Sequence, residues 1–124
     1  MQSIRLYFPI FSVNQLLSPV VGEFKQARDK LLMFNTRLLS MLPKNARVPS
    51  EKLPVGIYIK FFTTKDHYQV ENFCFIAYQI VKVLGHATII QDTNLSCVWG
   101  VAYDVEIIEK QCDEGCEISF VENP

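Results

Sequence analysis

Cys112 and Cys116 are the only closely spaced cysteines in the sequence. A Cys-x-x-x-Cys spacing suits either a disulfide across a turn or two thiolate ligands of a metal ion. A structural zinc site needs a second pair of ligands, and the other candidates are scattered along the chain: Cys74, Cys97, His67 and His86. We therefore expect free thiols or an incidental disulfide here rather than a metal site, and we expect no cofactor.

Sequence patterns that position a catalytic nucleophile or a phosphate group are absent. No Gly-x-Ser-x-Gly elbow occurs, and the five glycines are too scattered to form a phosphate-binding loop. His67 and His86 fall near opposite ends of a predicted helix, about 25–30 Å apart at the helical rise per residue, so they cannot serve one site. We expect no catalytic residues, and a protein that is not an enzyme.

Negative charge is concentrated toward the C-terminal end of the sequence. Residues 1–90 carry eleven Lys or Arg against five Asp or Glu, a balance of +6, whereas residues 91–124 carry one Lys against eight carboxylates, a balance of −7. A strongly basic protein surface is the natural partner for such a segment, because complementary charge speeds encounter and gives specificity. The alternative is that these charges only keep strand edges of different molecules from pairing. The residues that we expect to bind the partner are Asp104, Glu106, Glu109, Asp113, Glu114 and Glu117.

Nucleic acid and membranes are less suitable partners. The net charge is −1, and aromatic residues do not interleave with the basic residues that could follow a phosphate backbone. No apolar run approaches the length of a membrane span. The apolar stretch Ile4–Phe11 is short and lacks a small-residue cleavage site, so it does not resemble a signal peptide. We expect a cytoplasmic protein.

Two helices are predicted to support these residues. The more apolar one covers Asp66–Gly85, with Asp66 as its N-cap and Gly85 as its left-handed stop. Apolar residues recur there at spacings of three and four: Val70, Phe73, Cys74, Ala77, Ile80, Val81 and Leu84. An amphipathic helix begins at Ser18-Pro19 and ends near Leu42.

Five strands are predicted: Ile4–Phe11, Val55–Thr63, Ala87–Gln91, Cys97–Glu109 and Glu117–Glu122. The fourth has the clearest alternation, with Asp104 and Glu106 on one face. Its other face is lined by Trp99, Val101, Tyr103, Val105 and Ile107.

The element order is therefore β-α-β-α-β-β-β within a single globular domain, residues 1–124. We expect an α+β fold of two layers, in which both helices pack on one face of a mostly antiparallel sheet. The last two strands are predicted to form a C-terminal antiparallel hairpin that presents the acidic residues.

Two functions follow from this interpretation. In the first, the chain is a small interaction module that docks its acidic hairpin on a basic protein. Small bacterial immunity and antitoxin proteins neutralise nuclease-like toxins in this way, and the analogy is one of size and charge layout. In the second, the chain is a small α+β enzyme or ligand-binding domain with a pocket between the central helix and the sheet, lined by Tyr58, Tyr78, Trp99 and Tyr103. The oligomeric state is left open.

Overall fold

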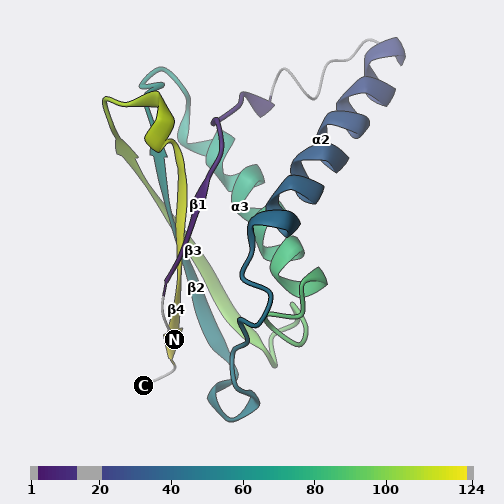
Figure 1. Ribbon diagram of the computed structural model, residues 1–124, viewed down its shortest axis with the longest axis vertical. Helices are drawn as coiled ribbons and strands as arrows, with labels where there is room; N and C mark the ends of the chain where they lie inside the picture. Colours follow the sequence, from purple (N-terminus) through teal and green to yellow (C-terminus); the bar gives the residue numbers. More distant parts are fainter. Residues whose placement is uncertain (1–2, 14–20, 123–124) are drawn as a thin grey trace.

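The computed structural model describes residues 3–13 and 21–122 as two helices packed on a four-stranded mixed sheet (Figure 1). The strands are β1 (Ile4–Tyr7), β2 (Val55–Thr63), β3 (Val98–Ile107) and β4 (Gly115–Glu122). The helices are α2 (Val21–Met41) and α3 (Val70–His86), and two short 3₁₀ turns cover Ser50–Lys52 and Gln111–Asp113. The α+β class with both helices on one side of the sheet is confirmed.

The strand order is β1-β4-β2-β3, which places β4 at the centre beside β2. β4 runs antiparallel to both β1 and β2, whereas β2 and β3 are parallel. The parallel pair is connected through α3, because parallel neighbours need a crossover that is usually a helix. α3 lies along the sheet, and α2 leans on α3 and diverges from the sheet toward its own N-terminal end (Figure 1).

The core forms between α3 and the inner face of the sheet. Ile57, Ile59 and Phe61 alternate along β2 and are almost completely buried. The ring of Phe61 packs at 5.2 Å from the ring of Phe73 on α3. Each such side chain contributes about 1.5–3 kcal/mol by its removal from water, so the period-two pattern of β2 and the helical pattern of α3 together fix which face of the sheet is covered.

The predicted C-terminal hairpin is wrong, because β3 and β4 are not neighbours. Each pairs with β2 on a different side, β3 in parallel and β4 antiparallel. The predicted strand Ala87–Gln91 is also wrong, since this segment forms a turn. Ile89 and Ile90 are nevertheless buried, and the carbonyl of Ile89 accepts a hydrogen bond from Val48 N–H at 2.8 Å. The apolar residues of this segment therefore close the core without extending the sheet.

Several predicted boundaries move by a few residues. α3 begins at Val70 with Gln69 as N-cap and no side-chain capping bond, so Asp66 does not cap it. The left-handed position after the helix belongs to Thr88, with φ 56°, rather than to Gly85. The predicted start of the first helix at Ser18-Pro19 lies outside the described residues. In the described part of the chain, neither helix is both long and apolar enough to cross a membrane.

Candidate interaction surface

The side of the sheet that faces away from the helices is not covered by any element of residues 3–13 or 21–122 (Figure 1). We call this side the open face. Strand register determines which side chains it carries, because residues paired across neighbouring strands share a side and residues along a strand alternate. The open face is formed by Ser3, Arg5, Tyr7, Glu117, Ser119, Val121, Tyr58, Lys60, Phe62, Ala102, Asp104 and Glu106.

A row of alternating charges crosses the open face. Arg5, Glu117, Lys60 and Asp104 stand in register on four neighbouring strands. Lys60 Nζ also lies 3.1 Å from a carboxylate oxygen of Glu106, and this hydrogen bond raises the pKa of Lys60 above its usual 10.5. Opposite charges in cross-strand positions stabilise a sheet modestly, so part of the open face is electrostatically satisfied within the molecule.

Arg5 fastens the end of the sheet at which β4 begins. Its guanidinium group lies 4.3 Å from the ring centroids of both Tyr7 and Phe62. It also donates hydrogen bonds to the carbonyl oxygens of Leu6, at 2.7 Å, and Cys116, at 3.1 Å. Arginine is suited to this position because its planar group can stack on aromatic rings while its N–H groups donate in the plane. Arg5 is therefore engaged within the fold rather than free for a partner.

An aromatic pocket occupies the other end of the open face. Its volume is about 270 Å³, and we call it the Trp99 pocket. The Trp99 ring lies across β2 at Gly56, where a Cβ atom would stand 2.5 Å from the ring. The ring is nevertheless 47% exposed. The lining residues are Gly56, Ile57, Tyr58, Trp99, Gly100, Val101, Ala102 and Val121.

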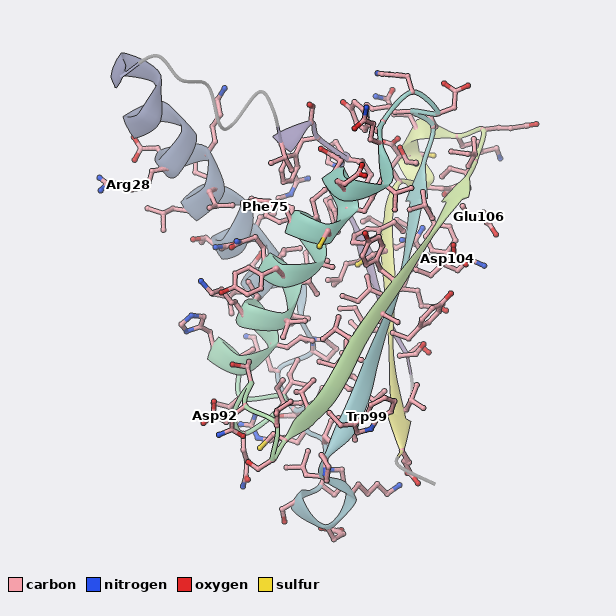
Figure 2. All side chains as sticks on the ribbon, turned by 180° about the vertical axis from the view of Figure 1, so that it is seen from behind. Arg28, Phe75, Asp92, Trp99, Asp104 and Glu106 are labelled. Atoms are coloured by element: carbon pink, nitrogen blue, oxygen red, sulfur yellow. The ribbon has the colours of Figure 1, made fainter. Side chains whose placement is uncertain are left out.

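Trp99 therefore lies on the side opposite to the one predicted. The alternation along β3 is interrupted near Trp99, where the pairing with β2 shifts from Val55–Val98 to Gly56–Gly100. Such a bulge inserts one unpaired residue and redirects its side chain. In Figure 2, Trp99, Asp104 and Glu106 all project from β3 away from the helices. Gly56 and Gly100 were the sequence signals that could have located the irregularity, because glycine inside a strand often accompanies a bulge or a close approach.

Glu114 is the clearest correction among the six predicted partner-binding residues. Its side chain is 1% exposed, and it accepts hydrogen bonds from Thr64 N–H at 2.6 Å and Lys65 Nζ at 3.0 Å. Ile10 N–H and the hydroxyl groups of Thr63 and Thr64 donate to it as well. Burial favours the neutral acid, but these donors lower the pKa of Glu114 from 4.5 to about 2. Glu114 therefore holds β4, β2 and the segment after β1 together.

The other five predicted residues remain at the surface. Asp104, Glu106 and Glu117 lie on the open face, while Glu109 and Asp113 lie in the connection from β3 to β4. They do not lie on one hairpin as predicted, because β3 and β4 are not neighbours. Among the described residues, Glu106 has an ion-pair partner in Lys60, whereas the carboxylates of the remaining four form no ion pair.

The opposite charges of the two chain segments meet inside the fold. Each lysine–glutamate ion pair of the described residues joins a lysine from residues 1–90 to a glutamate from residues 91–124. These pairs are Lys52–Glu122, Lys60–Glu106 and Lys65–Glu114. The charge asymmetry of the sequence therefore serves strand and loop association in part, besides any role at the surface.

The alternative pocket predicted between the central helix and the sheet does not form from its four aromatic residues. Tyr58 and Trp99 lie in the Trp99 pocket on the open face. Tyr78 and Tyr103 lie on the helix side, in a groove of about 220 Å³ between α3 and β3. Tyr103 donates a hydrogen bond to the carbonyl of Val70 at 3.3 Å. The sheet separates the two pairs.

All four cysteines are free thiols in the structure. Cys112 is exposed, whereas Cys116 is buried in β4, between β1 and β2. Burial raises the pKa of the Cys116 thiol to about 12, which keeps it protonated. Within residues 3–13 and 21–122, no three His, Cys, Asp or Glu side chains are grouped so as to hold a metal ion.

Comparison of the sequence with known protein families found no matching family, and comparison with curated proteins found no match either. The case for a function therefore depends on the geometry of the open face.

Proposed function

We propose that this chain is a protein-interaction module that binds its partner through the open face of the sheet. The observation that carries this proposal is Trp99, which lies against Gly56 of β2 and is 47% exposed, beside a pocket on a face that no described helix covers. Tryptophan and tyrosine commonly dominate interface energies because they bury a large apolar area and keep a polar group. The pocket has a volume of about 270 Å³ and a mostly apolar lining, which suits an apolar side chain of a protein.

We propose that the partner presents basic side chains next to that apolar group. Asp104 lies on the same strand as the Trp99 pocket, and Glu109 and Asp113 are exposed in the connection that follows β3. These three carboxylates have no ion-pair partner among the described residues, so lysine or arginine of another protein can meet them without breaking a bond of the fold. Charge complementarity of this kind favours rapid and specific association.

A nuclease-like toxin is the class of basic protein that we propose, with an immunity-type role for this chain. The support is an analogy: small inhibitors of such toxins cover a cationic active site with carboxylates. The four free thiols support a reducing compartment such as the cytoplasm. An enzyme or small-molecule binding function has less support, because the aromatic residues that were to line its pocket lie on opposite sides of the sheet.

The proposal is tested by substituting the two parts of the open face separately. The immobilised full chain captures its partner from the native host, and the purified partner is then titrated by calorimetry. We expect Trp99→Ala and Asp104→Lys each to weaken binding by about thirtyfold or more, the range of interface residues worth 2 kcal/mol. Met33→Ala and Asp29→Lys are the matched controls on the exposed surface of α2, and they should leave affinity within about twofold.

Two results would contradict the proposal. Equal binding by Trp99→Ala and the unaltered chain would remove the open face from the interface. If Trp99→Ala weakens binding but Asp104→Lys does not, and the partner is acidic or neutral, the open face remains the interface but the partner is not a basic toxin. Circular dichroism of each variant separates loss of binding from loss of folding.

A further inference from the structure

β3 is an edge strand whose outer side has no hydrogen-bonded neighbour in residues 3–13 or 21–122. It is ten residues long, whereas β1 at the opposite edge has four. A long unpaired edge offers backbone donors and acceptors to a strand of another molecule. Proline, charges and bulges commonly protect such edges. β3 contains no proline, its bulge lies near its first residues, and its two charges, Asp104 and Glu106, lie in one half of the strand.

The hydrogen bonds near the end of β3 identify which backbone groups point outward. Ile108 N–H donates to the carbonyl of Thr63 on the β2 side at 2.9 Å, whereas Val105 N–H donates to the Asp104 carboxylate at 2.8 Å. Backbone groups of successive residues alternate in direction along a strand. The outward N–H and C=O groups therefore belong to Val101, Tyr103, Val105 and Ile107.

Apolar side chains line the same edge on the helix side. Val101 and Ile107 of β3 are 47% and 56% exposed, and Val70 and Tyr78 of α3 are 63% and 58% exposed. The groove of about 220 Å³ between α3 and β3 runs among Cys74, Ala77, Tyr78, Val81, Val101 and Tyr103. Apolar side chains gathered beside an unpaired strand are typical of a protein–protein interface.

The charges along this edge suit a second copy of the same chain. Val98–Ala102 carries no charge, whereas Asp104 and Glu106 lie in the other half of the strand. If two β3 strands pair antiparallel about a two-fold axis near Tyr103, each carboxylate stands opposite Ala102 or Gly100 of the other copy. A parallel pair in register would instead oppose like charges, which destabilises cross-strand pairs. The charge pattern therefore permits self-association in the antiparallel orientation.

The apolar side chains of α3 have the same symmetry. The Tyr103 hydroxyl donates to the carbonyl of Val70, so the first part of α3 lies near the proposed axis. Since α3 accompanies β3, the two-fold axis also makes the two α3 helices antiparallel. An isologous interface places the same surface of each copy on the axis, so the exposed apolar residues Val70, Tyr78 and Val101 meet the same residues of the other copy.

We propose that two copies of this chain associate through their β3 edges, antiparallel, to form a continuous eight-stranded sheet from two four-stranded ones. Both α3 helices lie on one face of that sheet and bury the groove lined by Tyr78, Val101 and Tyr103. The open face stays uncovered on the other side of that sheet. The carboxylates of each copy then stand beside Ala102 and Gly100 of the other, which line the Trp99 pocket, so the tests of the dimer measure self-association and not partner binding.

The mass of the full chain in solution is the first test. Light scattering after size exclusion should give twice the monomer mass of 14.3 kDa and should fall toward it on dilution. Val101→Lys places two lysines in the apolar groove of a two-fold interface, and we expect it to raise the dissociation constant by about thirtyfold or more. The matched control, Met33→Lys on α2, substitutes a side chain that is 72% exposed and should leave the mass unchanged.

Hydrogen exchange distinguishes β3 pairing from any other dimer. The amides of residues 101 and 103 should be protected from exchange at high protein concentration. Both should exchange rapidly in the monomeric Val101→Lys variant. A monomer at about 100 μM, a concentration at which even weak specific dimers form, overturns the proposal. A dimer in which the Tyr103 amide exchanges freely, or which Val101→Lys leaves intact, overturns it as well.

Discussion

Trp99 lies across Gly56 on the open face, so close that a Cβ atom at position 56 would stand 2.5 Å from the indole ring. The contact joins β3 to β2 at the point where their register shifts. Trp99 is nevertheless 47% exposed. The exposed aromatic surface of the Trp99 pocket therefore depends on the absence of a side chain at position 56.

Gly56→Ala should displace the Trp99 ring. Because Trp99 is the only tryptophan in the chain, its fluorescence reports this contact alone, and we expect a red-shifted emission maximum and stronger quenching by iodide. Gly100→Ala is the matched control on the neighbouring strand, since nothing lies within 4 Å of a Cβ atom there. A spectrum unchanged by Gly56→Ala would mean that the ring does not rest on β2.

Glu114→Gln should destabilise the fold by about 2–4 kcal/mol, because it leaves Lys65 without its anion and weakens several hydrogen bonds at once. Urea denaturation measures the change. Glu109→Gln, at an exposed position of the same acidic segment, should alter the free energy of unfolding by less than about 0.5 kcal/mol. Equal effects of the two substitutions would argue that Glu114 is not buried.

The stability of the protein should fall in acid through Glu114. Its pKa is about 2 in the folded chain, against an ordinary 4.5, so the unfolded chain takes up the proton first as the pH is lowered. The stabilisation is therefore complete above pH 4.5 and is lost as the pH approaches 2, to a total of about 3 kcal/mol. Urea midpoints between pH 6 and pH 2.5 should fall more steeply for the unaltered chain than for Glu114→Gln. Parallel curves would refute this assignment.

The four thiols should divide into two classes. Cys74 and Cys112 are exposed, whereas Cys97 and Cys116 are buried, and the high pKa of Cys116 suppresses its thiolate. A thiol reagent should therefore modify Cys112 in the native protein and Cys97 and Cys116 only in denaturant. Cys74 lines the groove between α3 and β3, so it should react most readily in the monomeric Val101→Lys variant. Mass spectrometry of the labelled peptides identifies them. Rapid modification of Cys116 in the native protein would contradict its burial in β4 between β1 and β2.

Local sequence patterns predicted where the helices and strands lie along the chain better than they predicted which strands pair with each other. The β-branched and aromatic run Val55–Thr63 is β2 with the predicted bounds, and Asp104 and Glu106 share a face as expected. Alternation along one strand carries no information about which strand lies beside it. The hairpin was therefore inferred from proximity in the sequence, whereas β2 provides pairing edges for both β3 and β4.

The candidate site was harder to predict, because it depends on contacts between distant residues. Nothing in the segment around Glu114 indicates burial, since its donors come from Ile10 and from Thr63–Lys65. Trp99 lies on the side of the sheet opposite to the predicted one because the pairing of β3 with β2 shifts by one residue there. Both features arise from pairing across the sheet, which a reading of one segment at a time cannot reveal.

The central place of β4 has a consequence for how the chain is made. Of the four strands, β1 is synthesised first, yet within residues 3–13 and 21–122 it pairs with β4 alone, more than a hundred residues later. Until β4 is synthesised, β2 has one neighbouring strand, β3, instead of two. The nascent polypeptide must therefore hold its apolar surfaces in an incomplete state through most of translation, and the final strand acts as the step that commits it to the native topology.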